Sequence, residues 1–254
     1  MNRPTLSVSI VSHGQAELVS ELLSDLQQHC ADESLEVLLT INVPEPLPAT
    51  LNEFSLPLKI IHNTSRLGFA ENNNRAFEQA EGDFFCVLNP DIRMKHNIFP
   101  ALMNELSDVS IGIVAPLVVD GSGAIEDSAR KFPTPFKIFC KLLGGCSGSD
   151  YEIHDVPIYP DWVGGMFMVF RREIYKEIKG FNQKYFLYYE DVDICAKVWL
   201  KGMKVCLIPQ VSATHVAQRS SHKKIRYLWI HIRSMRRFFF SASFLKLMLF
   251  QKNR

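Results

Sequence analysis

The sequence has no acidic residue after Asp193, although Lys and Arg continue to its last position. The part beyond Asp193 therefore carries 13 positive charges, the part up to Asp193 has a net charge of −12, and the whole chain of 254 residues has +1. This separation predicts a basic segment at the carboxyl end. Because the chain as a whole is not basic and has no recognised nucleic-acid-binding motif, we expect no nucleic-acid partner.

Long apolar runs and paired cysteines are missing as well. No uninterrupted run reaches the roughly 18 apolar residues that indicate a transmembrane helix. A strand-like segment begins at Leu6, with no basic region and apolar core before it, so we expect no signal peptide and a cytoplasmic location. The 6 cysteines include no Cys-x-x-Cys pair, which argues against a zinc site and a disulfide framework.

Strand-like and helical stretches alternate along the chain, whose hydrophobic content of 47% is enough for a sizeable core. The expected strands are 6–12, 35–42, 58–62, 83–88, 111–119 with an interruption at Pro116, 162–173 and 205–208. The expected helices are 18–26, 71–77, 99–106 and 190–199. This order predicts an α/β fold with a mostly parallel central sheet flanked by helices, and a ligand site beyond the carboxyl ends of the strands.

Residues 186–193 (FLYYEDVD) place three acids behind four large apolar or aromatic residues. Aromatic side chains that exclude water would raise the proton affinity of a carboxylate, as a general base requires. Glu190, Asp191 and Asp193 equally suit the first turn of a helix, where acids complement the helix dipole. Both interpretations stay open on this segment alone.

Polar residues follow three of the expected strands. The amide-rich turn from Asn63 to Asn72 could hold a nucleotide, or it could simply cap a helix. Asp91 follows strand 83–88 and could bind a divalent cation, or it could belong to a Pro-containing turn. His215 could be a metal ligand or a structural histidine.

Two segments are expected to border the sheet. Residues 131–160 are rich in Gly and Pro, which predicts a long mobile loop over the site. Residues 219–254 interleave arginines with aromatics, as helices at an anionic membrane surface do. The alternative is a helix packed on the domain or on a second subunit. We therefore divide the chain into a domain of residues 1–218 and a basic amphipathic arm of residues 219–254.

Taken in order, several motifs resemble those of the inverting family 2 glycosyltransferases, in particular the rhamnosyltransferase-like bacterial members that build cell-surface polysaccharide. Each motif is weak alone, but the ordered set is specific and spans most of the chain. The motifs are the strand 7–12, Asn63-x-x-x-x-Gly68-Phe69-Ala70, Leu88-Asn89-Pro90-Asp91, the segment 162–173, Gly180-Phe181-Asn182, and the segments 186–193 and 209–215.

The resemblance implies a GT-A fold, a Rossmann-like sheet that binds a nucleoside-diphosphate sugar, with the acceptor over the carboxyl-terminal half. It implies a divalent metal, Mg²⁺ or Mn²⁺, on Asp91 and His215, and a catalytic base at Asp191 with Glu190 in support. The donor-binding residues it implies are Ser12, His13, Asn42, Arg66, Gly68, Asn72, Asn89 and Asp91. The acceptor-side residues it implies are Trp162, Gly164, Gly165 and Tyr189.

The sequence departs from the family pattern after the second strand, where many relatives have Asp-Asn and this chain has Ile41-Asn42. The nucleobase is therefore open among dTDP, UDP and GDP donors. We expect inverting transfer of a sugar, rhamnose among the candidates, to a lipid-linked or polysaccharide acceptor at the inner face of the cytoplasmic membrane, by a protein that could form homo-oligomers. Two alternatives are a non-catalytic nucleotide-sugar-binding subunit and a nucleotidyltransferase. Hydrolysis is disfavoured because adjacent helical carboxylates cannot flank a substrate.

Overall fold

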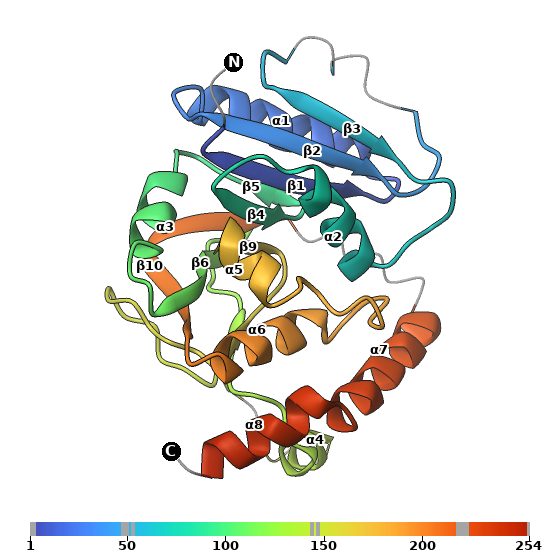
Figure 1. Cartoon of the computed structure of the whole chain (residues 1–254), viewed down its shortest axis with the longest axis vertical. Coiled ribbons are helices and arrows are strands. Elements are labelled where there is room, and N and C mark those ends of the chain that lie inside the picture. Colours follow the sequence, from blue (N-terminus) through green and yellow to red (C-terminus); the bar gives the residue numbers. More distant parts are fainter. Residues whose placement is uncertain are drawn as a thin grey trace.

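A computed structural model describes residues 4–46, 51, 54–142, 145, 148–216 and 224–252. Its main feature is an eight-stranded sheet with the strand order β3-β2-β1-β4-β9-β6-β10-β5 (Figure 1). The strands are β1 (Leu6–Ser12), β2 (Leu35–Ile41), β3 (Leu58–His62), β4 (Phe84–Leu88), β5 (Ile92–Arg93), β6 (Ile111–Asp120), β9 (Phe167–Arg171) and β10 (Lys204–His215). A separate two-stranded sheet joins β7 (Ala129–Arg130) to β8 (Trp162–Val163).

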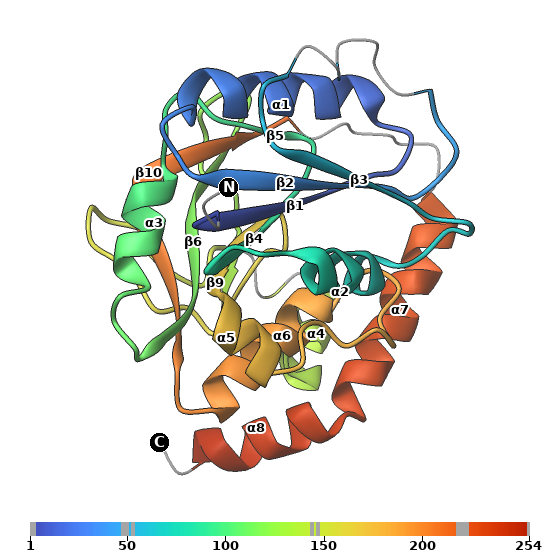
Figure 2. The same ribbon diagram turned by 45° about the horizontal axis from the view of Figure 1, so that its top comes forward.

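Helices cover both faces of the sheet (Figure 2). On one face lie α1 (Ala16–His29) and α3 (Phe99–Glu105), and on the other lie α2 (Phe69–Gln79), α5 (Arg172–Glu177) and α6 (Glu190–Leu200). Successive side chains of a strand point to opposite faces, so Phe85 and Val87 enter one core while Cys86 and Leu88 enter the other. The predicted α/β fold with flanking helices is confirmed.

Parallel pairing dominates the first half of the sheet, where β3, β2, β1 and β4 are all parallel neighbours. The strand β9 runs antiparallel to both β4 and β6, and β5 runs antiparallel to β10. Its register places Leu88 opposite Phe167, and the Asn89 N–H donates to the Met166 carbonyl over 2.9 Å. The segment that precedes β9 therefore lies directly beside the carboxyl end of β4.

Three local predictions were wrong. The expected strand 162–173 is divided into β8 and β9, and its last two residues begin α5. Pro116 does not interrupt the fifth strand, because β6 runs through it. The pairing of β6 with β10 shifts between Ile208 and Ser212, next to Pro116, so a bulge accommodates the missing N–H donor. Residues 131–160 are not irregular throughout either, because they contain the helix α4 (Pro135–Leu142).

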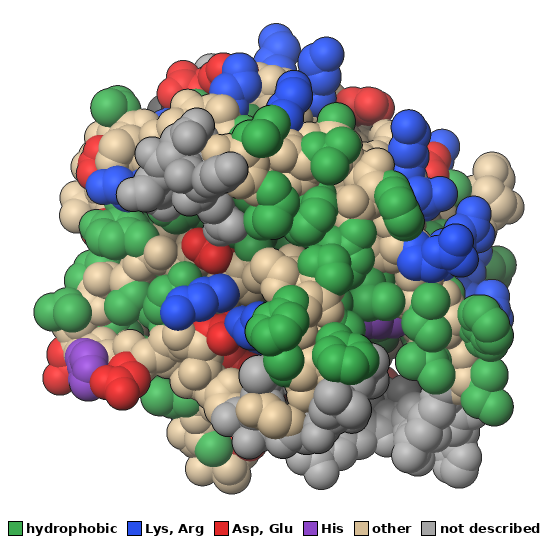
Figure 3. Space-filling view, turned by 90° about the horizontal axis from the view of Figure 1, so that it is seen from below, with side chains coloured by type: hydrophobic (Ala, Val, Ile, Leu, Met, Phe, Trp, Pro, Cys, Tyr) green, Lys and Arg blue, Asp and Glu red, His purple; other side chains and the backbone are tan. Residues whose placement is uncertain are grey.

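The carboxyl-terminal helices α7 (Lys224–Phe239) and α8 (Ala242–Lys252) pack beside α6. On α7, Phe238 is fully buried, and the Ser234 hydroxyl donates to the Leu187 carbonyl over 2.8 Å. Within the described part of the chain, no helix combines the length and apolar character needed to cross a membrane. Figure 3 views the end of the molecule that carries α4 and α8. The predicted boundary between residues 218 and 219 lies outside the described residues.

Candidate active site

The segment 186–193 makes a sharp turn before it enters a helix. Tyr188 and Tyr189 both have left-handed backbones, with φ of 67° and 69°. Two consecutive non-glycine residues in this region are strained, and such strain persists only where the surroundings hold it. Tyr189 packs against His231 and Phe238 of α7, with ring centroids 5.4 and 5.6 Å apart. The turn makes Glu190 the first residue of α6, so the helix-start and active-site interpretations describe the same structure.

Asp191 is held by two backbone donors. The Val192 N–H donates to its Oδ1 over 2.8 Å, and the Gly165 N–H donates to its Oδ2 over 3.3 Å. Glu190 is buried instead, and its Oε2 has no hydrogen-bond partner among the described residues. Two neighbouring carboxylates thus occupy different surroundings.

Burial is the main cause of the raised pKa values of Asp191 and Glu190. It raises the pKa of Asp191 above its usual value, although the backbone donors and the Arg130 charge act in the opposite direction. Burial and the adjacent Asp191 raise the pKa of Glu190 well above its usual value. Because Asp191 receives more backbone hydrogen bonds that favour a carboxylate than Glu190 does, we infer that Asp191 is the ionised member of the pair and that Glu190 retains the proton.

Asp191 opens into a cavity of about 670 Å³. Trp162 and Tyr189, both predicted on the acceptor side, line it together with Asp191. Gly164 and Gly165 lie next to it, since the Gly164 N–H donates to the Ser128 carbonyl over 2.8 Å and Gly165 contacts Asp191. The remaining lining residues come from the segments 127–150 and 186–193 and from α7: Asp127, Arg130, Lys131, Pro133, Lys137, Ile138, Gly148, Ser149, Asp150, Tyr188, Val192, His231 and Met235.

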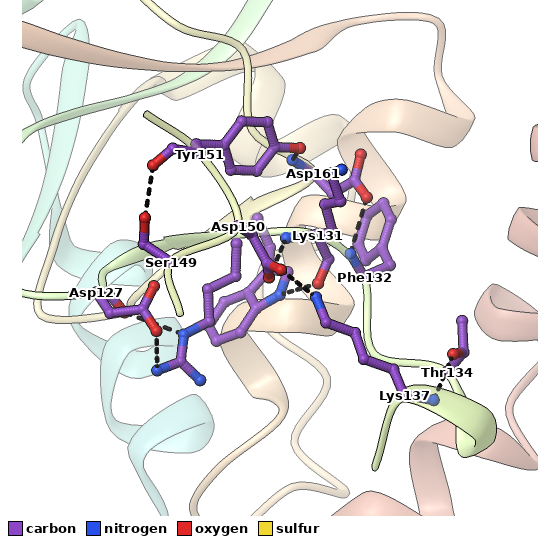
Figure 4. A network of polar contacts seen from close by, with 11 residues as sticks. Asp127, Lys131, Phe132, Thr134, Lys137, Ser149, Asp150, Tyr151 and Asp161 are labelled. Atoms are coloured by element: carbon purple, nitrogen blue, oxygen red, sulfur yellow. Dashed lines mark hydrogen bonds and ion pairs between the residues drawn. The ribbon is translucent and has the colours of Figure 1, made fainter. Parts of the chain in front are cut away.

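One wall of this cavity is a polar network (Figure 4). Asp150 accepts a hydrogen bond from the Lys131 backbone N–H over 3.0 Å and pairs with the Lys137 ammonium. Arg130 pairs with Asp127 over 2.6 Å, and its guanidinium lies 5.9 Å from the centre of the Trp162 ring. The wall therefore presents cations that are already oriented by carboxylates.

The predicted donor-binding residues lie at the carboxyl ends of β1, β2 and β3. Asn42 accepts from the Leu67 N–H over 2.9 Å and from Asn63 Nδ2 over 3.0 Å, and its own Nδ2 donates to the Leu67 carbonyl over 3.0 Å. Asn63 also donates to Asn72 over 2.6 Å, and Asn72 is fully buried. His13 lies 3.3 Å from Asn42 Nδ2. These amides hold the turn after β3.

That turn is docked on the segment 186–193. The Phe69 N–H donates to the Phe186 carbonyl over 2.9 Å, and a Cβ on Gly68 would come within 2.6 Å of the same oxygen. Only glycine permits this approach. Arg66 is exposed and lies 5.3 Å from the centre of the Phe186 ring. The turn after β3 and the segment 186–193 are therefore directly connected.

Asp91 and His215 meet as predicted. The short strand β5 pairs antiparallel with the end of β10 and aligns Ile92 with His215. His215 Nε2 lies 3.2 Å from Asp91 Oδ2, and Nδ1 lies 2.9 Å from Glu126 Oε2. The hydrogen bond to Asp91 is the main reason that the pKa of His215 rises to about 9. Ser12 is the last residue of β1, and Asn89 directly follows the neighbouring strand β4.

The residues around Asp91 fit a hard divalent cation. Asp91 Oδ1 is buried and has no hydrogen-bond partner among the described residues, so this oxygen is left to coordinate a cation. Carboxylate oxygens are the protein ligands that Mg²⁺ and Mn²⁺ prefer. No group of three or more His, Cys, Asp or Glu side chains in the described ranges forms a metal site by itself. A donor diphosphate would therefore have to supply further ligands.

The sequence did not reveal several residues at the site, among them Glu126 beside His215 and three that line the Asp191 cavity. Glu126 and Arg130 precede a Pro-rich segment and belong to no motif that was considered. His231 and Met235 lie in the segment assigned to an arm, yet they line the same cavity as Asp191. Their spacing of four residues places them on one face of a helix, and this pattern could have indicated that they share a surface.

Comparison with known proteins identifies the family. Residues 7–179 match the model of glycosyl transferase family 2, and residues 152–223 match that of the N-terminal domain of galactosyltransferase. Rhamnosyltransferase WbbL of Escherichia coli K12 is 29% identical over 227 residues, which cover 84% of each chain. N-acetylglucosaminyl-diphospho-decaprenol L-rhamnosyltransferase of Mycobacterium tuberculosis H37Rv is 24% identical over 58% of this chain and 55% of its own length.

Solved structures share the fold. GalNAc-T7, solved with UDP, GalNAc and Mn²⁺, has a TM-score of 0.69 at 18% identity over 92% of this chain and 48% of its own. Mannosyltransferase PcManGT of Pyrobaculum calidifontis, solved with GDP-Man and Mn²⁺, has a TM-score of 0.63 at 20% identity over 93% and 65%. The predicted resemblance and GT-A fold are confirmed: the chain belongs to glycosyl transferase family 2 and is a glycosyltransferase.

Proposed function

We propose that the protein transfers a sugar, with rhamnose the first candidate, from a nucleoside-diphosphate donor to a hydroxyl group of a lipid-linked or polysaccharide acceptor. The observation that carries the proposal is the cavity of about 670 Å³ into which Asp191 opens. Aromatic walls at Trp162 and Tyr189 suit the apolar faces of a sugar ring. The relatives named as rhamnosyltransferases support the choice of sugar.

The chemistry assigned to Asp191 is proton removal. The acceptor hydroxyl lies in the cavity and gives its proton to the Asp191 carboxylate while its oxygen attacks the anomeric carbon. The bond from that carbon to the diphosphate oxygen breaks on the opposite face, and the electron pair leaves with the nucleoside diphosphate. One displacement inverts the anomeric configuration. Glu190 keeps its proton and leaves Asp191 the single base.

The donor lies along the carboxyl edge of the sheet, with Arg66 and the turn 63–69 on one side and Asp91 on the other. Asn42 and Asn72 act indirectly by holding this turn, since their side chains are engaged with Asn63 and Leu67. Asp91 and His215 would hold Mg²⁺ or Mn²⁺, which stabilises the charge that develops on a leaving diphosphate. The structures solved with Mn²⁺ support this assignment.

The place of action that we propose is the inner face of the cytoplasmic membrane, as a peripheral protein. Lipid-linked acceptors occur there, and the name of the mycobacterial relative includes such an acceptor. The support within this chain is the basic α7, which has no acid in its first turn and ends with Arg236 and Arg237.

The test is product identification. The protein is incubated with dTDP-rhamnose, UDP-sugars or GDP-sugars, with a lipid-linked diphosphate acceptor, and with Mg²⁺, Mn²⁺ or EDTA. We expect one donor class to release nucleoside diphosphate and to give a product whose anomeric configuration is inverted by NMR. Pyrophosphate as the product would instead indicate a nucleotidyltransferase, and donor binding without turnover on any acceptor would indicate a binding subunit.

A further inference from the structure

A second cavity, of about 700 Å³, lies on the other side of α7. It is bounded by α7, by the start of α8 and by the turn around Asn182. Its lining residues are Asn182, Lys184, Trp229, Ile232, Arg233, Arg236, Arg237, Phe240, Ser241, Ala242 and Ser243. Four of them are cations, and none of the described lining residues is acidic.

Among the residues that the structure describes, no carboxylate pairs with these cations. No ion pair within the described ranges involves Lys184, Arg233, Arg236 or Arg237, and neither α7 nor α8 has an acidic residue in its first turn. Four positive charges that face one cavity repel one another unless an anion enters it. Arg suits phosphate in particular because its planar donors match the phosphate oxygens.

Exposed apolar side chains lie beside this cavity. Trp229 is 68% exposed and Phe240 is 83% exposed, and both line it. Figure 3 shows Lys and Arg side chains gathered along one margin of this end of the molecule, next to hydrophobic side chains. Aromatic residues next to cations are typical of the boundary between lipid headgroups and acyl chains. A soluble phosphate compound would make no use of the exposed Trp229 and Phe240.

We propose that the cavity between α7 and α8 binds the phosphate of an anionic phospholipid headgroup, with Arg233, Arg236, Arg237 and Lys184 as its ligands. This inference rests on the membrane contact proposed above and gives that contact a discrete site. Ser241 and Ser243 line the same cavity, but their hydroxyl groups interact with Tyr185 and Asp193, so the four cations are the ligands that the cavity offers.

The site also orients the enzyme, because α7 separates the two cavities. His231 and Met235 line the Asp191 cavity, whereas Trp229, Arg233 and Arg236 line the basic one. A headgroup bound on one side of α7 therefore fixes the position of the Asp191 cavity relative to the membrane surface. A lipid-linked acceptor could then reach Asp191 without leaving the bilayer.

The test compares two charge-matched double variants of the full chain. The cavity variant, Arg233→Gln with Arg236→Gln, removes two cations of α7 that line the cavity. The control variant, Arg226→Gln with Lys246→Gln, removes one exposed cation from α7 and one from α8, both outside the cavity. Binding is measured by co-sedimentation with vesicles of phosphatidylcholine alone and of phosphatidylcholine with phosphatidylglycerol. Circular dichroism checks that both variants fold.

We expect the wild type to bind the vesicles that contain phosphatidylglycerol and not those of phosphatidylcholine alone. The cavity variant should lose about tenfold or more in affinity, and the control variant about threefold or less, because each loses the same charge but only one loses phosphate ligands. Equal losses would overturn the discrete site and leave only diffuse attraction. If the wild type does not bind vesicles that contain phosphatidylglycerol, both this site and the membrane contact are overturned. Sugar transfer is tested separately, with an acceptor dispersed in detergent. Inorganic phosphate that binds the cavity while vesicle binding is unchanged in the cavity variant would overturn the lipid as the ligand.

Discussion

The carboxyl edge of the sheet and the Asp191 cavity satisfy their polar groups in different ways. At the edge, Asn42, Asn63 and Asn72 bond to one another and to Leu67, so the turn after β3 is held by buried amides. In the cavity, Glu190 Oε2 has no hydrogen-bond partner among the described residues, and Asp191 accepts from the Gly165 and Val192 N–H groups. The contrast teaches that the edge is held rigid by paired amides, as the proposed donor site requires, whereas the proposed base lies where carboxylates are poorly solvated.

The largest effect is expected at Asp191. Asp191→Asn removes the base but keeps the size of the side chain, so the turnover number should fall by about 10²–10⁴-fold. Asp150→Asn is the matched control, because Asp150 lines the same cavity but is engaged by Lys131 and Lys137. Initial rates of nucleoside diphosphate release measure both. Equal rates for Asp191→Asn and the wild type would end the assignment of the base.

A second variant breaks the connection between the two regions. Gly68→Ala adds a Cβ that would lie 2.6 Å from the Phe186 carbonyl oxygen, and a backbone atom cannot yield as a side chain can. We expect a loss of about 1–3 kcal/mol in the free energy of unfolding. Turnover should fall about tenfold or more, because a shift near 1 Å misplaces the catalytic turn.

Gly121→Ala is the control for that variant, since nothing lies within 4 Å of a Cβ at Gly121. Urea unfolding and the initial rate are measured for both variants. Retention of wild-type stability by Gly68→Ala would contradict the tight docking of the two turns.

A third variant sharpens the comparison through pH. Burial and Asp191 raise the pKa of Glu190 well above its usual 4.5. Below that usual value Glu190 is neutral in both the folded and the unfolded chain. As the pH rises, the unfolded chain ionises first, so the free energy of unfolding of the wild type falls until the folded pKa is passed.

Glu190→Gln cannot ionise, so it should be more stable than the wild type near pH 7.5, with the difference vanishing near pH 4. Denaturant unfolding at the two pH values measures this, with the exposed Glu78→Gln as control. A destabilised Glu190→Gln at neutral pH would show that a buried Glu190 carboxylate is favoured after all.

The smallest effect is expected at the contact between α7 and the catalytic turn. Ser234→Ala removes the hydrogen bond to the Leu187 carbonyl, which should cost about 1 kcal/mol in the free energy of unfolding. The neighbouring carbonyl would be left without that donor, so turnover should fall only a few-fold. Ser122→Ala is the control, because the Ser122 hydroxyl donates to Asp120 within its own exposed turn. Thermal unfolding and initial rates are measured for Ser234→Ala and Ser122→Ala, and only Ser234→Ala should differ from the wild type.

Much of the sheet could be predicted because its strands are short apolar runs with polar ends. The strands 6–12 and 58–62 have the predicted bounds, and α6 starts at Glu190 as its acids indicated. The continuity of β6 through Pro116 could not be predicted, because the bulge in β10 that accommodates the proline lies about 90 residues further along the chain.

The candidate site could be predicted where residues end a strand or belong to one of the ordered motifs, as Trp162, Tyr189 and Asp191 do. Asp91 and His215 were expected to be close and are 3.2 Å apart. Glu126, Arg130 and His231 were not found, because they reach the site through the β7–β8 sheet and through α7, and these contacts join distant parts of the chain. The roles of the site residues in donor binding and catalysis stay predictions.

Donor affinity in two variants tests the division between the two regions most directly. Titration calorimetry with the nucleoside-diphosphate sugar and Mn²⁺ would compare Asp91→Asn with Asp191→Asn. The account predicts that Asp91→Asn weakens donor binding by about tenfold or more, because a carboxylate ligand of the metal is lost, while Asp191→Asn binds the donor as the wild type does. Wild-type affinity in Asp91→Asn, or a comparable loss in Asp191→Asn, would contradict it.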